Sequence, residues 1–193
     1  MKQQLQSIAI YCGSSQGENP AFAAAARHTG RTLAEKNIEI IYGAGNVGLM
    51  GLTADAALAA GGKVCGVIPQ FLKDWEVYHD GLTEIIVTET MHQRKQIMVN
   101  RADAFIALPG GFGTLDELFE ILTWGQLRLH AKPIGILNVA GYYDNLLAHI
   151  RGIADAGFMQ PANLGWVKSA DNLQELLYQM ENFLQPEADK WVK

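Results

Sequence analysis

The sequence predicts a doubly wound, Rossmann-like α/β fold with a mostly parallel sheet of about six or seven strands and helices on both faces. Short apolar runs alternate with longer segments of helical periodicity along the chain. Several apolar runs also end in glycine-rich turns, which is typical of strands that lead into helices near a ligand. A length of 193 residues with 49% hydrophobic residues favours one nucleotide-binding domain over 1–193.

Continuous apolar runs mark the strands, as expected for strands covered on both faces. They are residues 7–12, 38–42, 64–68, 83–88, 105–108 and 133–137, with 166–168 as a short seventh. Helical patterns lie between them, at residues 21–36, 48–60, 91–102, 114–128, 142–156 and 173–183. Asn19 and Pro20 predict the start of the first helix, because a capping side chain and a first-turn proline favour helix initiation. The tail from Pro186 to Lys193 is predicted to fray.

Charge, cysteine content and hydropathy argue against several classes of protein. A net charge of −5 and a pI near 5.5 argue against nucleic-acid binding, which normally needs a clustered basic face. Cys12 and Cys65 lack metal or redox spacing, and each is expected to pack as a small hydrophobe in a reducing compartment. The histidines show no paired ligand spacing, so no metal site is expected. No apolar run approaches about eighteen residues, so we expect no membrane span and a cytoplasmic protein.

The stretch from Ala104 to Glu117 predicts a buried strand, a glycine-rich turn and then a helix beginning at Thr114. Gly110, Gly111 and Gly113 allow the backbone to approach a ligand closely. The helix start adds unpaired N–H groups and the positive end of a helix dipole. The sequence therefore predicts a phosphate site here.

Two interpretations of Glu117 remain open. Thr114 to Glu117 matches a T-x-x-E capping box, in which the cap alone contributes about 0.5–2 kcal/mol. Local chemistry by itself favours this capping role over catalysis. However, a carboxylate beside an anion site makes little sense for binding alone, so a catalytic role is the alternative.

Residues 43–48 match the dinucleotide-binding pattern G-x-G-x-x-G. That pattern requires an acidic residue about 20 positions on, at the end of the next strand, but Pro69 ends that strand. NAD or FAD binding is therefore disfavoured, and Gly45 and Gly48 are expected to serve strand–helix packing or close approach to another ligand. Because ligands bind beyond the carboxyl ends of such strands, Ser14 and Gly45 are candidate contacts on the same rim as the phosphate loop.

The helix from Met91 carries the positive charge that an anionic ligand would need. Arg94 and Arg101 are seven residues apart and share a face, with Lys95 beside Arg94. The alternative is a solvated surface stripe. The opposite side is apolar enough to bury, through Ile97, Met98 and Ala102.

Taken together, these motifs resemble the LOG (Lonely Guy) family of cytokinin riboside 5′-monophosphate phosphoribohydrolases. The family's P-G-G-x-G-T-x-x-E is intact from Pro109 to Glu117, and its Met-x-x-Arg-Lys element runs from Met91 to Lys95. Members are often labelled lysine decarboxylases, but no lysine here has a convincing Schiff-base setting. The likeness covers nearly the whole chain, including residues 13–15, 48–51, 122–124, 132–133 and 141–143. Ala44 departs from the family, in which many members have glycine.

The resemblance implies hydrolysis of the N-glycosidic bond of AMP or an N6-modified, cytokinin-type AMP, to free base and ribose 5-phosphate. It implies Arg94 and Glu117 as the catalytic pair, no metal or cofactor, and a homodimer with the site near the subunit contact. The implied substrate contacts, with the two rim candidates, are Ser14, Gly45, Glu76, Arg94, Lys95, Gly110, Gly111, Phe112, Gly113, Thr114, Leu115, Asp116, Glu117 and Thr123.

A second class of function remains open: a noncatalytic nucleotide-binding or regulatory module with the same phosphate loop, in which Glu117 only caps the helix. Within the enzyme interpretation, a prenyl preference would depend on an apolar pocket. Met91, Met98 and Trp124 are candidates for it, although core packing is the favoured role for each.

Overall fold

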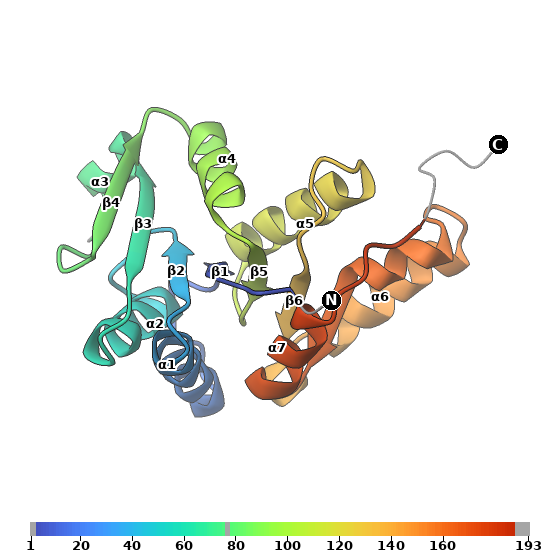
Figure 1. Cartoon of the computed structure of the whole chain (residues 1–193), viewed down its shortest axis with the longest axis horizontal. Helices are drawn as coiled ribbons and strands as arrows, with labels where there is room; N and C mark the ends of the chain where they lie inside the picture. The colour runs from blue at the N-terminus through green and yellow to red at the C-terminus, as the bar shows by residue number, and fades with distance from the viewer. Residues whose placement is uncertain (1–2, 76–77, 188–193) are drawn as a thin grey trace.

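A computed structural model of the chain confirms the predicted fold class. The structure describes residues 3–75 and 78–187. Seven strands form one parallel sheet in the order β4-β3-β2-β1-β5-β6-β7. The strand order runs outward from β1 in both directions, so the topology switches between β1 and β5 near the middle of the sheet (Figure 1).

All seven predicted strands are present, and the structure adds short elements that the sequence did not predict. The strands are β1 Ser7–Tyr11, β2 Glu39–Tyr42, β3 Val64–Pro69, β4 Glu84–Thr88, β5 Ala104–Ala107, β6 Ile134–Leu137 and β7 Val167–Ala170. The predicted helices are α1 Pro20–Glu35, α2 Gly48–Ala59, α4 Met91–Arg101, α5 Phe112–Gln126, α6 Asp144–Asp155 and α7 Leu173–Glu181. The additions are α3 Gln70–Trp75 and the 3₁₀ turns η1 Val139–Gly141 and η2 Pro161–Trp166. The helix α3 is only six residues long and buries none of them, so it is too short to show helical periodicity in the sequence.

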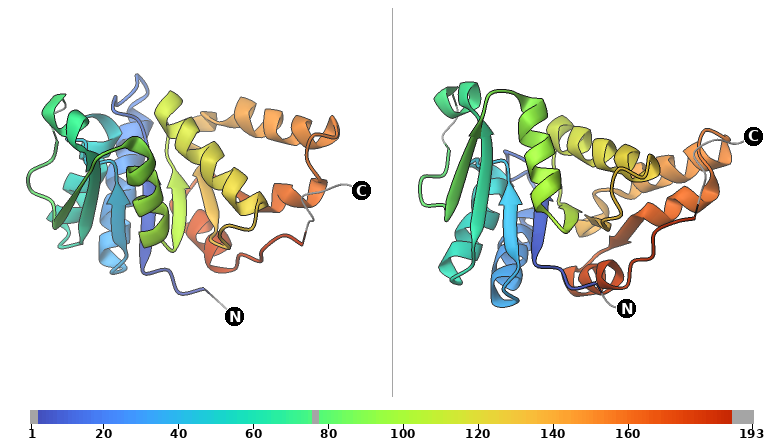
Figure 2. Two further views of the ribbon diagram at one scale, coloured as in Figure 1. Left: turned by 90° about the horizontal axis from the view of Figure 1, so that it is seen from above. Right: turned by 45° about the horizontal axis from the view of Figure 1, so that its top comes forward.

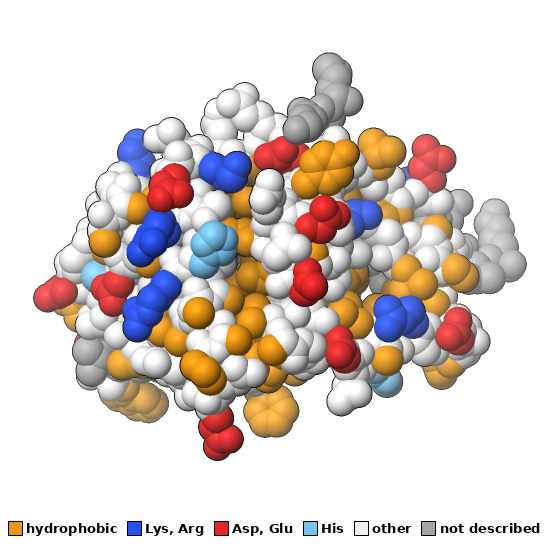
Figure 3. All heavy atoms as spheres, turned by 90° about the horizontal axis from the view of Figure 1, so that it is seen from below, with side chains coloured by type: hydrophobic (Ala, Val, Ile, Leu, Met, Phe, Trp, Pro, Cys, Tyr) orange, Lys and Arg blue, Asp and Glu red, His pale blue; other side chains and the backbone are white. Residues whose placement is uncertain are grey.

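Helices cover both faces of the sheet. Ile8 and Ile10 of β1 pack with α1, α2 and α7, whereas the alternate residues Ala9 and Tyr11 pack on the other face with α4, α5 and α6. Figures 1 and 2 show α4 and α5 on one side of the sheet and α1 and α2 on the other. On the α1–α2 side, hydrophobic side chains gather in the middle of the face and side chains of both charges lie around them (Figure 3).

Local signals at two helix starts agree with the structure. The side chain of Asn19 accepts a hydrogen bond from the N–H of Ala21, and Pro20 opens α1, as predicted. Thr90 caps α4 by accepting from the N–H of Gln93 at 3.2 Å, while the Gln93 side chain accepts from the N–H of Glu89. A capping-box type of exchange therefore fixes the start of α4.

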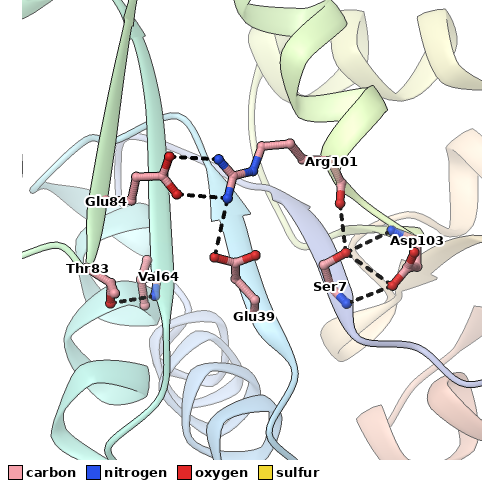
Figure 4. A network of polar contacts seen from close by, with 7 residues as sticks. All are labelled: Ser7, Glu39, Val64, Thr83, Glu84, Arg101 and Asp103. Carbon is pink, nitrogen blue, oxygen red and sulfur yellow. Dashed lines mark hydrogen bonds and ion pairs between the residues drawn. The ribbon is translucent and has the colours of Figure 1, made fainter.

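Arg101 connects residues at the amino edge of the sheet, as Figure 4 shows for its contacts with Glu39 and Glu84. Its two terminal nitrogens each donate to Glu84 at 2.8 Å, and Nη2 lies 3.7 Å from Glu39. Beside it, Ser7 donates to the Arg101 carbonyl and Asp103 accepts from the Ser7 backbone. The prediction that Arg101 and Arg94 would serve one anionic ligand is wrong, because α4 separates them to opposite edges of the sheet.

Both cysteines are free and buried, one in each hydrophobic layer, which confirms the predicted packing role. Burial raises the pKa of each thiol, that of Cys65 to about 11. None of the described helices is both long and apolar enough to cross a bilayer. Residues 188–193 of the predicted frayed tail lie outside the described chain.

Candidate active site

The loops that follow β1, β2 and β5 meet at the carboxyl edge of the sheet, as the shared-rim prediction required. Gly13 joins them. Its N–H donates to the carbonyl of Pro109 at 3.0 Å, and its own carbonyl accepts from the N–H of Leu49 at the start of α2. Gly48 has a positive φ of 64° and packs against the backbone of Ser14, where a side chain would clash. This close packing brings the three loops around one cavity.

The cavity has a volume of about 250 Å³ and combines an apolar wall with a polar one. Ile10, Cys12, Met50 and Met91 form the apolar wall. The other lining residues are Gly13, Ser14, Gly43, Arg94, Gly111, Phe112, Gly113, Thr114, Asp116 and Glu117. Among the residues that the structure describes, no lysine lines it, which fits poorly with a Schiff-base enzyme.

The start of α5 lies open on this cavity. The helix begins at Phe112, two residues before the predicted Thr114, and Gly111 is its N-cap without any side-chain cap. The predicted capping box from Thr114 to Glu117 is therefore wrong, because Thr114 already lies inside the first turn. Since a helix leaves its first N–H groups without intrahelical partners, this uncapped end offers donors to an anion.

Arg94 and Glu117, the predicted catalytic pair, meet in the cavity wall. Nη2 of Arg94 lies 3.3 Å from Oε1 of Glu117, and each side chain is only 11% exposed. The Nη1 atom of Arg94 lies 3.9 Å from the sulfur of Met91, and Nε is buried without a hydrogen-bond partner in the described chain. Gly43 gives the guanidinium room, because a Cβ there would overlap Nη2. Arg94 and Glu117 therefore hold each other in place, but Arg94 keeps a buried N–H donor without a hydrogen-bond partner in the described chain.

Burial raises the pKa of Glu117 to about 7, and the positive charge of Arg94 opposes this rise. Asp116 and Glu120 raise that pKa further, whereas Lys95 lowers it. A carboxyl group with such a pKa exchanges a proton readily near neutral pH, as general acid–base chemistry requires.

Lys95, a predicted substrate contact, does not reach the cavity. Its ammonium group lies 3.1 Å from Asp116 and 3.1 Å from Glu120, both on α5. Burial opposes the charged form of Lys95, but the hydrogen bonds that its ammonium group donates to these two carboxylates outweigh this and raise its pKa. Lys95 therefore ties α4 to α5, and Asp116 is the member of this group that also lines the cavity.

The remaining predicted contacts separate into two groups. Ser14, Gly111, Phe112, Gly113, Thr114 and Asp116 line the cavity, whereas Gly45, Gly110, Leu115 and Thr123 do not. Gly45 pairs with Tyr78, and Gly110 packs so tightly against Thr114 and Gly13 that no side chain would fit. Thr123 donates to the Phe119 carbonyl and faces an apolar groove between α5 and α6. Glu76 lies outside the described residues.

The apolar wall was largely missed by sequence reasoning. Of the three candidates for an apolar pocket, only Met91 lines the cavity, since Met98 is fully buried and Trp124 lies on the outer face of α5. Gly43 and Met50 also line the cavity. The sequence could have suggested them, because they flank the glycine-rich loop after β2, which was predicted to lie at the same edge of the sheet as the phosphate loop. In residues 3–75 and 78–187, no three His, Cys, Asp or Glu side chains group as metal ligands.

The parallel sheet and the cavity at its switch point define a Rossmann-like α/β protein. A molybdenum cofactor carrier protein from Chlamydomonas reinhardtii has the same fold, with a TM-score of 0.71 over 93% of this chain and 98% of that one. At 19% identity this likeness concerns the fold alone.

Sequence comparison places the chain more narrowly: it belongs to the LOG family. The family model described as "Possible lysine decarboxylase" matches residues 50–180. Two proteins of Arabidopsis thaliana, each named a cytokinin riboside 5′-monophosphate phosphoribohydrolase, are 46% and 44% identical to it. These matches cover 98% and 99% of this chain and 87% and 89% of the relatives.

Proposed function

We propose that this chain is a phosphoribohydrolase that cleaves the N-glycosidic bond of purine nucleoside 5′-monophosphates, releasing free base and ribose 5-phosphate. One observation carries the proposal: a buried Arg94–Glu117 pair lies in the same small cavity as the uncapped start of α5. A phosphate site and a carboxyl group of raised pKa are the two features that such a hydrolase needs side by side. The names of the Arabidopsis relatives support the same activity.

The 5′-phosphate binds at the start of α5. A Cβ at Gly111 or Gly113 would meet nothing within 4 Å, and neither residue has a positive φ. Neither packing nor backbone conformation therefore requires glycine there, whereas close approach of a ligand does. Thr114 lines the cavity and is 3% exposed, and we propose that its hydroxyl donates to the phosphate.

Glu117 acts on the ribose. When the bond between C1′ and the base nitrogen breaks, its electron pair leaves with the base and positive charge develops on the sugar ring. The Glu117 carboxylate stabilises that charge and takes a proton from the water that adds to C1′, and the departing base takes up one proton in turn. Arg94 has a free Nε donor with which to fix the phosphate and ribose or to assist the departing base.

The finer features of the proposal concern substrate and setting. Met50 and Met91 line the cavity and would flank the base of AMP or an N6-modified AMP. We also expect a homodimer in the cytoplasm. The apolar groove between α5 and α6, with Phe119 and the 86% exposed Phe158, supports a subunit contact there. Thr123 lies in this groove and would contact substrate only through that subunit contact. Light scattering of the purified protein measures the mass, and a monomer at micromolar concentration would contradict the dimer.

Incubation with AMP and chromatographic detection of adenine tests the activity. Rates on AMP, GMP, CMP and isopentenyladenosine monophosphate rank the substrates, and EDTA should leave them unchanged. Tight AMP binding without base release over hours would instead favour the noncatalytic nucleotide-binding module.

A further inference from the structure

Three successive carbonyls of the glycine-rich loop are all held by donors from outside the loop. The Leu108 carbonyl accepts from the hydroxyl of Tyr143 at 2.7 Å, and the Pro109 carbonyl accepts from the N–H of Gly13 at 3.0 Å. The Gly110 carbonyl accepts from the hydroxyl of Tyr142 at 2.6 Å. No carbonyl in this run is left to face the cavity.

This pattern matters because a trans peptide points its carbonyl and its N–H in opposite directions. Holding the Gly110 carbonyl against Tyr142 therefore turns the N–H of Gly111 the other way. Gly111 lines the cavity, and Tyr142 and Tyr143 do not. The Gly111 carbonyl is bonded to the N–H of Leu115 in the first turn of α5, which directs the N–H of Phe112 outward from the helix end.

The two tyrosines are themselves placed by an unusual turn between β6 and α6. Ala140 and Gly141 have positive φ values of 52° and 72°, which turns the chain sharply just before Tyr142. Asn138 secures this turn: its side chain accepts from the N–H of Tyr143 and donates to Asp144, both at 2.7 Å.

Packing of the rings fixes the hydroxyls further. The ring of Tyr142 packs edge-to-face on the ring of Tyr143 at 4.8 Å and on Phe22 of α1 at 5.3 Å. Tyr143 is 2% exposed and Tyr142 is 44% exposed. A buried and a half-exposed tyrosine, adjacent in sequence, thus reach carbonyls two residues apart in the loop.

We propose that Tyr142 is a positioning residue for phosphate binding, acting by turning the Gly110 carbonyl away from the cavity so that the N–H of Gly111 faces the 5′-phosphate. Tyr143 holds the Leu108 carbonyl, whose peptide has no N–H because the next residue is a proline, so Tyr143 only anchors the end of the strand. The inference rests on the proposed function for its ligand. It predicts that the hydroxyl of Tyr142 matters for phosphate affinity although it lies outside the cavity.

Tyr142→Phe in the full chain tests this, because it removes one hydroxyl from a half-exposed ring. We expect KM for AMP and the dissociation constant of ribose 5-phosphate to rise together, by about 2- to 10-fold, as for loss of one neutral hydrogen bond. The kcat value should change little, since the phosphate contact is equal in ground and transition states. Inhibition by adenine, which has no phosphate, should be unchanged.

Tyr42→Phe is the matched control. The Tyr42 hydroxyl is buried without a hydrogen-bond partner in the described chain, so the same deletion there should leave both constants as in the wild type. Tyr143→Phe should lower Tm, because it leaves the buried Leu108 carbonyl unpaired. It should raise the two constants less than Tyr142→Phe does, because the Leu108–Pro109 peptide has no N–H to reorient. If Tyr143→Phe does not fold, Tyr142→Phe still decides.

Calorimetric titration with ribose 5-phosphate separates this inference from the proposed activity. Wild type that binds ribose 5-phosphate but releases no adenine from AMP would overturn the activity alone, and weaker binding by Tyr142→Phe would still support the role of Tyr142. Equal binding by Tyr142→Phe and wild type, no binding by wild type, or a lower Tm and kcat with unchanged KM would overturn that role.

Discussion

Arg94 and Arg101 lie in the first and last turns of one helix, α4, and each meets a glutamate from another element. At the amino edge of the sheet, Arg101 makes two 2.8 Å hydrogen bonds to Glu84 and has Glu39 nearby (Figure 4). At the carboxyl edge, Arg94 makes a single 3.3 Å contact with Glu117 and keeps a buried Nε unpaired. Both are arginine–glutamate pairs, but the guanidinium of Arg101 is hydrogen-bonded through both terminal nitrogens, whereas that of Arg94 keeps a donor without a partner in the described chain.

The difference appears in the carboxyl groups. Hydrogen bonds from Arg101 lower the pKa of Glu84, because that carboxylate is solvated and fully paired. Burial raises the pKa of Glu117 to about 7, because the single 3.3 Å contact with Arg94 does not compensate for the lost hydration of the carboxylate. A fully paired arginine stabilises the fold, whereas a partly paired one beside a cavity is available to a substrate.

Replacing each glutamate by glutamine gives the largest expected difference. Glu117→Gln should lower kcat for base release about 10³-fold, since removal of a general acid–base group typically costs 10²- to 10⁴-fold. Glu84→Gln should leave kcat near the wild-type value. Adenine release from AMP gives both rates, and circular dichroism checks folding. An inactive Glu84→Gln, or an active Glu117→Gln, would contradict the assignment.

The stability of the two ends should depend on pH with opposite signs. The pKa of Glu117 rises from its ordinary 4.5 to about 7, so its favourable contribution is complete below pH 4.5 and is lost as pH rises through 7. Relative to wild type, Glu117→Gln should therefore gain stability across that window, by at most about 3 kcal/mol. The pKa of Glu84 is lowered, so its contribution is present above pH 4.5 and is lost as pH falls.

Urea unfolding at several pH values from below 4 to 8 measures both effects. Relative to wild type, Glu84→Gln should be less stable at neutral pH, and this difference should shrink on acidification. A free-energy difference between Glu117→Gln and wild type that stays constant with pH would mean that Glu117 titrates normally in the folded protein.

Exchanging each arginine for lysine compares the same change at both ends of α4. Arg94→Lys should lower kcat/KM about 10- to 100-fold with little change in Tm, because lysine keeps the charge but not the planar set of donors. Arg101→Lys should lower stability by about 1 kcal/mol, since a point charge cannot make both bonds to Glu84, and should leave kcat/KM unchanged. Steady-state kinetics and thermal melts measure these two effects. Loss of kcat/KM in Arg101→Lys, or loss of stability without loss of kcat/KM in Arg94→Lys, would contradict the roles assigned to the two arginines.

The smallest effect concerns two helical glycines with open space around them. A Cβ at Gly113 in α5 or at Gly152 in α6 would meet no atom within 4 Å. Alanine should therefore stabilise either helix by up to about 1 kcal/mol. Only Gly113→Ala should raise KM for AMP, because only Gly113 lines the cavity. An unchanged KM in Gly113→Ala would show that phosphate does not approach there.

Local patterns predicted much of the fold because their causes are local. The strand β5 is an uninterrupted buried run, and the cap of α1 depends on neighbouring residues alone. The same kind of reasoning failed at Thr114. A T-x-x-E sequence is equally compatible with the first turn of a helix, and the contacts of Gly13 and Tyr142 with the loop come from other parts of the chain. An exchange of the capping-box type occurs instead at Thr90 and Gln93.

The sequence by itself determined the fold class, the order of strands and helices and the glycine-rich loop, because periodicity and backbone preferences act over a few residues. The candidate pair Arg94 and Glu117 came from the resemblance of the sequence motifs to the LOG family. Only the tertiary structure decided which arginine meets which glutamate, that Lys95 is already paired, and that Thr123 lies outside the cavity. The raised pKa of Glu117 also belongs to the tertiary structure. Loss of water and ion pairing depend on side chains that approach one another from distant parts of the chain, and no local pattern records those distances.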